Sequence, residues 1–155
     1  LPLKKKLILF PWNPSRPVKR FDIVQEVFEQ LLEKYAVDIV TVFDKPPKTV
    51  SKYMNACDVM ILASNHEGSP MAVREALSCH LPIVSVDVGD VAEMIRNVKN
   101  CYLVDQDVRE ITKKITTIFE TKQSRSEKRI TESNTLSAEH SVNEIIKIYQ
   151  KILQS

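Results

Sequence analysis

Five short apolar runs constrain the fold of this 155-residue sequence more than any other feature. Within each run the apolar residues are continuous and do not alternate with polar ones. That pattern is typical of strands in a parallel sheet that is covered on both faces. The predicted strands span 7–10, 37–43, 59–62, 83–86 and 101–104.

Amphipathic segments separate the five runs. Between 21 and 35 the apolar residues recur at the spacing of one helix face. Asp90 with Glu93, and Asp107 with Glu110, have the spacing of capping boxes at two further helix starts. The predicted helices span 21–35, 49–56, a segment that begins at 70, 91–96, 108–119 and a C-terminal helix within 136–155.

Alternating strands and helices predict an α/β fold. It is a Rossmann-like, doubly wound parallel sheet flanked by helices, in one domain over 1–155. Ligands of such sheets bind beyond the carboxyl ends of the strands. Three informative loops, 11–20, 64–70 and 87–90, each follow a strand. We therefore expect these loops to converge on one edge of the sheet.

Composition excludes several classes of function. A net charge of +2 is too small to indicate a nucleic-acid partner, and no apolar run approaches the length of a membrane-spanning helix. The three histidines are scattered, so no metal site is expected. The three cysteines have no paired spacing and lie in apolar contexts, which favours buried thiols in a reducing compartment.

Glycine is scarce: the chain contains only Gly68 and Gly89. Neither the Rossmann GxGxxG loop nor the Walker A loop can be written with two glycines so far apart. A phosphate would therefore have to be bound by a helix N-terminus together with basic side chains.

The segment 66–76, which runs from His66 to Ala76, carries the strongest candidate chemistry. Ser69 is predicted to cap a helix with Pro70 at its first position, so that free amides face the crevice. Gly68 would let a ligand approach the backbone. Glu67 could accept hydrogen bonds from sugar hydroxyls and Glu75 from a ribose diol. The alternative is that both glutamates are ordinary solvated or helix-favouring residues. His66 could contact a ligand or be a surface turn residue.

A basic loop follows the first strand. Arg16 and Lys19 could reach a diphosphate there, although a solvated, solubilising cluster is the alternative. Trp12, in the same loop, is expected to be either a packing residue or a stacking platform.

Taken in order, these segments resemble the donor-binding half of retaining GT-B glycosyltransferases, most closely the glycosyl transferases group 1 (GT4). The resemblance covers roughly 7–150, and the two glutamates match the E-x7-E motif of that family. Its segments are Asn55-Ala56-Cys57-Asp58-Val59, Glu67-Gly68-Ser69-Pro70, Glu75-Ala76, Leu81-Pro82-Ile83-Val84-Ser85 and Val88-Gly89-Asp90-Val91-Ala92-Glu93.

The resemblance implies roles for these residues. Glu75 would bind the ribose, Glu67 would lie near the donor sugar, and Lys19 with Arg16 would neutralise the diphosphate leaving group. Such enzymes generally need no metal or other cofactor, because basic side chains and helix amides replace it. The remaining implied donor-binding positions are Gly68, Ser69, Pro70, Met71 and His66.

The sequence departs from the family pattern at three places. His80 and Arg20 stand where the family commonly has glycine. The stretch from Tyr35 to Asn55 is short and is expected to lack one strand–helix excursion, which leaves 43–48 as a weak candidate for base contacts.

The resemblance also implies a larger enzyme. The N-terminal acceptor domain of a GT-B enzyme is expected to be absent from this chain, so the domain alone should fold, bind nucleotide weakly and transfer sugar inefficiently. The expected activity is hexosyl transfer from a nucleotide-diphosphate sugar to a glycan or lipid-linked acceptor in polysaccharide, glycolipid or glycoconjugate biosynthesis. The expected location is the cytoplasm, or the inner face of the membrane for the parent enzyme. The alternatives are a GT-B-fold nucleotide-sugar epimerase and a non-catalytic nucleotide-sugar-binding module.

Overall fold

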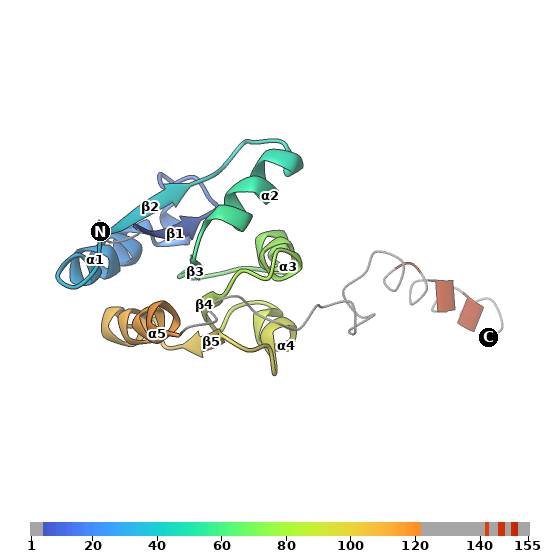
Figure 1. Ribbon diagram of the computed structural model, residues 1–155. Helices are drawn as coiled ribbons and strands as arrows, with labels where there is room; N and C mark the ends of the chain where they lie inside the picture. Colours follow the sequence, from blue (N-terminus) through green and yellow to red (C-terminus); the bar gives the residue numbers. More distant parts are fainter. Residues whose placement is uncertain (1–4, 122–141, 143–145, 148–149, 152–155) are drawn as a thin grey trace.

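The computed structural model describes residues 5–121, 142, 146–147 and 150–151. Within this part of the chain, five parallel strands form one sheet in the order β2-β1-β3-β4-β5 (Figure 1). The predicted parallel sheet is confirmed. Its strands are β1 Lys6–Phe10, β2 Val37–Thr41, β3 Val59–Leu62, β4 Ile83–Val86 and β5 Cys101–Val104.

Helices cover both faces of this sheet, as the continuous apolar runs predict. Buried residues of α1 and α5 pack with one face, and those of α2, α3 and α4 pack with the other. Neighbouring strand residues divide between the faces: Ile8 joins the first cluster and Leu9 the second. The helices are η1 Pro17–Lys19, α1 Phe21–Leu32, α2 Pro47–Ala56, α3 Met71–Ser78, α4 Val91–Ile95 and α5 Val108–Glu120.

Several predicted ends differ from the observed ones. The strand expected at 37–43 ends at Thr41, and the helix expected at 21–35 ends at Leu32. α2 begins two residues earlier than predicted, at Pro47, because proline has no N–H to lose at the first helical position. The five described residues within 136–155 are helical, and the rest of that predicted helix lies outside the described residues.

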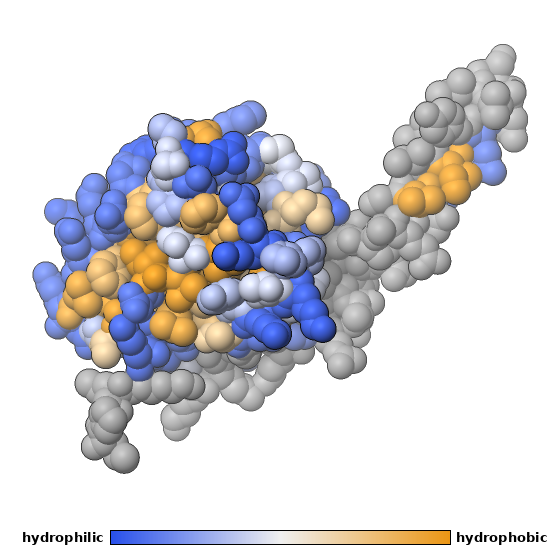
Figure 2. Space-filling view, turned by 90° about the horizontal axis from the view of Figure 1, so that it is seen from above, coloured by the Kyte–Doolittle hydropathy of each residue, from blue (hydrophilic) through white to orange (hydrophobic). Residues whose placement is uncertain are grey.

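The chain passes directly from β2 to α2 through residues 42–46, which leaves β2 as an edge strand. Asp38, Ile39 and Val40 are only partly buried there. The view from the side of β2 and α2 shows apolar surface bordered by hydrophilic residues (Figure 2). The short connection agrees with the expectation that this segment lacks one strand–helix excursion.

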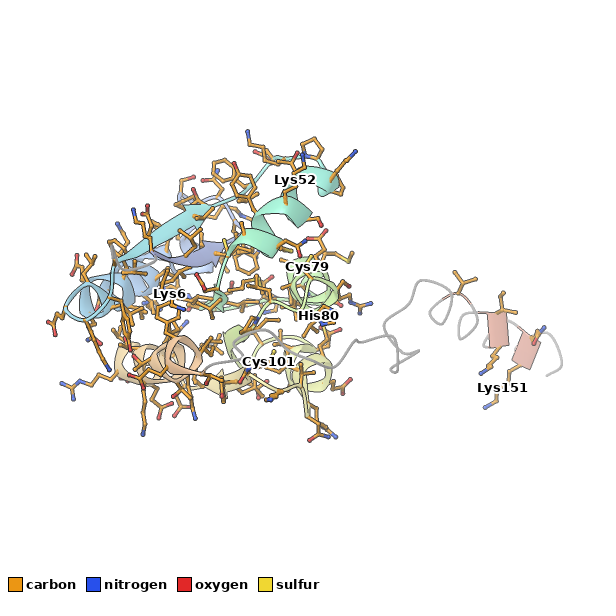
Figure 3. All side chains as sticks on the ribbon, in the orientation of Figure 1. Lys6, Lys52, Cys79, His80, Cys101 and Lys151 are labelled. Atoms are coloured by element: carbon orange, nitrogen blue, oxygen red, sulfur yellow. The ribbon has the colours of Figure 1, made fainter. Side chains whose placement is uncertain are left out.

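The two residues that stand where the family pattern commonly has glycine both adopt the left-handed conformation. Arg20 has φ 54° and His80 has φ 56°. His80 follows the end of α3 (Figure 3). The Leu81 N–H donates to the Ala76 carbonyl at 2.9 Å and the His80 N–H donates to the Leu77 carbonyl at 2.9 Å. These two bonds define a Schellman motif, whose left-handed residue is usually glycine.

The strain at His80 predicts that glycine and alanine variants have opposite orders of stability at this position and inside a helix. A Cβ in the left-handed region costs roughly 1–2 kcal/mol, so His80→Gly should be more stable than His80→Ala by about 1 kcal/mol. At the exposed residue Gln25, in the interior of α1, the order should reverse, because glycine destabilises a helix interior by roughly 0.5–1 kcal/mol. Urea unfolding of the four variants measures both differences. Equal stability of the two His80 variants would contradict the strain.

The prediction of buried, unpaired thiols is confirmed in part. None of the three cysteines is in a disulfide, and Cys57 is buried, but Cys79 and Cys101 are only partly so. Desolvation raises the pKa of the Cys101 thiol to about 11. The neutral thiol is therefore the form present at neutral pH.

Alkylation with iodoacetamide should show this shift. Only the thiolate reacts, so the rate at Cys101 should rise about tenfold per pH unit from 8 to 10. A small thiol with an ordinary pKa of about 8.5 should approach its plateau in the same range. Mass spectrometry of the modified peptides, with a far-UV circular dichroism check that the fold persists, measures the rate. A plateau near pH 9 would show that the pKa of Cys101 is not raised.

Candidate functional site

The loops that follow β1, β3, β4 and β5 meet at the carboxyl edge of the sheet. The Asn65 N–H donates to the Val18 carbonyl at 2.9 Å, which joins the loop after β3 to η1. Gln106, after β5, donates from Nε2 to the Ala63 carbonyl at 2.7 Å. Asp90, after β4, donates its N–H to the Gly68 carbonyl at 3.2 Å. The predicted convergence of the loops 11–20, 64–70 and 87–90 is therefore confirmed.

Lys19 and Glu67 form an ion pair at the centre of this edge. Lys19 Nζ donates to Glu67 Oε1, and the Ser64 hydroxyl donates to the same oxygen at 2.7 Å. The side chains of Lys19 and Glu67 are only 6% and 11% exposed. The alternative of a solvated lysine and a merely helix-favouring glutamate is wrong for this pair.

Trp12 completes the surroundings of the lysine. Lys19 Nζ lies 4.7 Å from the centroid of the Trp12 ring, a cation–π contact. The ring also meets Phe10 edge-on, with 5.5 Å between centroids, and packs against both core clusters. Of the two expectations for Trp12, packing is therefore confirmed, and the ring faces a lysine of its own chain.

Burial explains why these groups occur together. Withdrawing a charge from water costs several kcal/mol, which the carboxylate, the hydroxyl and the ring offset only in combination. Removing one partner of such a buried pair typically destabilises a protein by about 3–5 kcal/mol. The β1 and β3 loops therefore fix one another through Lys19 and Glu67.

The two glycines of the chain lie against each other. Gly89 has φ 56°, and a Cβ on it would stand 1.9 Å from the Gly68 carbonyl oxygen. A Cβ on Gly68 would meet nothing within 4 Å. Close packing thus requires glycine at Gly89, while open space beside Gly68 is compatible with a ligand near its backbone.

The predicted cap of α3 is wrong in detail. α3 begins at Met71 with Pro70 as the N-cap, and no side chain caps it. The Ser69 hydroxyl instead donates to Asp90 Oδ2 at 2.8 Å and accepts from Arg74 Nη2 at 2.9 Å. Ser69 therefore fastens the 87–90 loop to the 64–70 loop and leaves the first amides of α3 without a side-chain cap.

Neither of the two predicted capping boxes is complete. Asp90 is the N-cap of α4, but its side chain does not accept from the helix amides, because it is engaged by Ser69 and lies 3.5 Å from Arg74 Nη2. Asp107 does cap α5 and accepts from the N–H groups of Arg109 and Glu110, but Glu110 Oε2 accepts from the Asp105 N–H at 3.2 Å and not from that of Asp107.

The structure does not bring every candidate into contact with the pair. Glu75 is half-buried on α3, and its carboxylate has no hydrogen bond or ion pair with another described residue. Arg16 is exposed and contacts Lys19 only through a backbone hydrogen bond. His66 and Met71 are exposed, Met71 by 63%. Their predicted contacts with a ligand stay predictions.

Sequence reasoning missed a polar group that holds the β3 loop. Gln106 Nε2 donates to Asn65 Oδ1 at 2.9 Å, and Arg20 Nη1 donates to both Asn65 Oδ1 and Gln106 Oε1 at 3.3 and 3.2 Å. Arg20 also pairs with Asp22, and its guanidinium holds the pKa of that carboxyl below its usual range. In the sequence, only their positions after strands or at the start of a helix could have indicated these residues.

No group of three metal-ligating side chains occurs among the described residues, and no described helix is long and apolar enough to cross a membrane. The histidine nearest the ion pair in sequence, His66, is an exposed loop residue.

The contact between the two glycines gives a direct prediction. Gly89→Ala must displace the Gly68 backbone and also hold alanine at positive φ, so it should destabilise the domain by about 2 kcal/mol or more. Gly68→Ala should cost less than 1 kcal/mol, because its Cβ meets open space. Thermal unfolding of both variants measures the difference. Equal losses would show that the two loops do not pack as described.

Comparisons with known proteins agree with this fold. The family model for glycosyl transferases group 1 matches residues 24–137. The chain is 30% identical over 71 residues to a Bacillus subtilis (strain 168) protein provisionally named teichuronic acid biosynthesis glycosyltransferase TuaC. That match covers 46% of this chain and 18% of TuaC.

Solved structures match the chain over nearly its whole length. TarM matches with a TM-score of 0.71 at 17% identity, over 99% of this chain and 36% of TarM. Sucrose-phosphate synthase from Thermosynechococcus elongatus matches with a TM-score of 0.64 at 19% identity, over 96% of this chain and 38% of the synthase.

HepE from Anabaena, solved in complex with UDP, matches with a TM-score of 0.60 at 19% identity, over 97% of this chain and 48% of HepE. The chain thus spans less than half the length of each of these proteins. The family model covers well over half of the chain, which therefore belongs to the glycosyl transferases group 1 family.

Proposed function

We propose that this chain binds the nucleotide-diphosphate sugar of a retaining, GT4-type hexosyltransferase that acts in glycan or glycolipid biosynthesis. The observation that carries the proposal is the placement of Lys19 and Glu67 together at the carboxyl edge of the sheet, beside the uncapped start of α3. That edge is where ligands of doubly wound sheets bind.

The groups at this edge suit a departing diphosphate. The sugar develops positive charge and the leaving phosphate negative charge as the bond between them breaks. Lys19 and the first amides of α3, which begins at Met71, would stabilise the phosphate, with Arg16 reaching in from the exposed loop. Glu67 would lie near the sugar and Glu75 near the ribose. No metal is needed in this arrangement.

Two relatives support the ligand and reaction classes. HepE, whose fold the chain shares, was solved with UDP, and TuaC is named as a glycosyltransferase. The epimerase alternative gains no such support, since neither of these two names refers to an epimerase. We place the enzyme in the cytoplasm or at the inner membrane face, where nucleotide sugars are used.

We further propose that the acceptor half of the enzyme is supplied outside these 155 residues. The chain corresponds to 36–48% of three structural neighbours, about the share expected of one of two domains. The domain alone should bind donor and transfer little sugar. Turnover of a labelled donor by this chain at the rate of a complete enzyme would contradict the division.

Calorimetry with UDP, GDP and ADP tests the site. Lys19→Ala and Glu75→Ala should each weaken the preferred diphosphate by about tenfold or more, because each removes charge-assisted or paired hydrogen bonds. Lys113→Ala and Glu29→Ala are matched controls. Both residues are exposed, on α5 and α1, which cover the face of the sheet opposite to α3.

Circular dichroism must first show that the variants are folded. Unchanged affinity in both site variants would refute the assignment of these residues. Failure of all three diphosphates to bind the wild-type chain would refute the proposed function.

A further inference from the structure

The Lys19–Glu67 pair poses a problem for the function proposed above. Lys19 is 5% exposed, and its ammonium is already committed to Glu67 and to the Trp12 ring. A diphosphate can use Lys19 only by competing with Glu67. Since Glu67 is itself expected near the donor sugar, both functional groups are engaged with each other before a donor arrives.

The two oxygens of Glu67 differ in their surroundings. Oε1 accepts from both Lys19 and Ser64, whereas Oε2 has no hydrogen-bond partner among the described residues. If Lys19 turned to a phosphate, Ser64 would be the donor left on Oε1. Ser64 is 1% exposed, so its hydroxyl stays beside that oxygen whether or not Lys19 does.

Trp12 has the corresponding role for the lysine. Its ring is fixed by Phe10 and by both core clusters, and the Lys19 ammonium lies over its face. The ring would still face the ammonium if its anionic partner changed from a carboxylate to a phosphate. The frame around the pair is equally fixed, because the Asn65 N–H is bonded to the Val18 carbonyl.

We propose that Ser64 and Trp12 are positioning residues of the donor site, and that they hold Lys19 and Glu67 in an ion pair that a bound nucleoside diphosphate takes apart. The phosphate replaces the Glu67 carboxylate as the partner of Lys19. Ser64 then keeps Glu67 in place, with its carboxylate released toward the sugar. This inference rests on the proposed function, because it assumes that a diphosphate binds at this edge.

The proposal predicts a gain of binding from the loss of a charge. Glu67→Gln replaces the competing carboxylate by a neutral amide, so the diphosphate should bind on the order of tenfold more tightly, the lower end of the value of a charge-assisted hydrogen bond. The corresponding nucleoside monophosphate should gain less. Glu120→Gln is the matched control, because Glu120 lies on α5 and pairs with Lys34, far from the site. The Glu120→Gln variant should bind the diphosphate with wild-type affinity.

Substitutions of Ser64 provide a second, independent test of the proposal. Ser64→Ala should weaken the diphosphate several-fold, because Glu67 Oε1 loses its remaining donor when Lys19 leaves, and Ser64→Thr should restore the affinity. In the Glu67→Gln background the same Ser64→Ala change should have little effect, since no carboxylate remains to be stabilised. A purely structural role of Ser64 would instead lower affinity equally in both backgrounds.

Trp12→Leu should weaken the diphosphate in both backgrounds, because the ring acts on Lys19 and not on Glu67. All affinities are measured by calorimetry on the 155-residue chain. If the wild type binds a diphosphate and Glu67→Gln binds it no more tightly, the displaceable pair is refuted and the proposed function stands. If neither protein binds any diphosphate, both are refuted.

Discussion

A lysine that is almost wholly withdrawn from water sets the arrangement of the site. Lys19 belongs to a three-residue helix after β1 and Glu67 to the loop after β3. These two strands are neighbours in the sheet, although α1, β2 and α2 lie between them in the chain. Neither charge would be stable in its place without the other. The pair therefore specifies the relative position of two loops that hydrophobic packing alone would leave adjustable.

Backbone contact secures the other side of the same loop. Gly89 lies against the Gly68 carbonyl, and Ser69 with Asp90 adds a side-chain bond across the same two turns. The loop after β3 is thus held from β1 by charge, from β4 by close packing and from β5 by the amide of Gln106. Each contact orients one part of a short segment between Ala63 and Met71.

The sequence predicted the fold well because the fold depends on periodicity. Unbroken apolar runs indicated strands buried on both faces, and the order of strands and helices then placed three loops at one edge. Which atoms meet at that edge was not predictable. Ser69 looked like a helix cap by residue type, yet a carboxylate 21 positions later in the chain was a better partner for its hydroxyl. Ser64 and Gln106 carried no local pattern, because their partners lie in other loops. Glu75 lies half-buried on α3, and its predicted contact with a ribose stays a prediction.

The near absence of glycine has a consequence for the chain before it folds. In the part of the chain that the structure describes, left-handed positions that glycine would enter freely are occupied by five residues with side chains: Arg20, Asp44, His80, Asn97 and Asn100. Each retains some strain in the native loop, although aspartate, asparagine and histidine tolerate this region better than most residues. Each also narrows the range of conformations of the unfolded chain. Relative to glycine, this lowers the entropic contribution to the free energy of folding by about 0.4–1 kcal/mol per position. These loops thus combine strain in the native state with a smaller loss of chain entropy on folding than glycine would give.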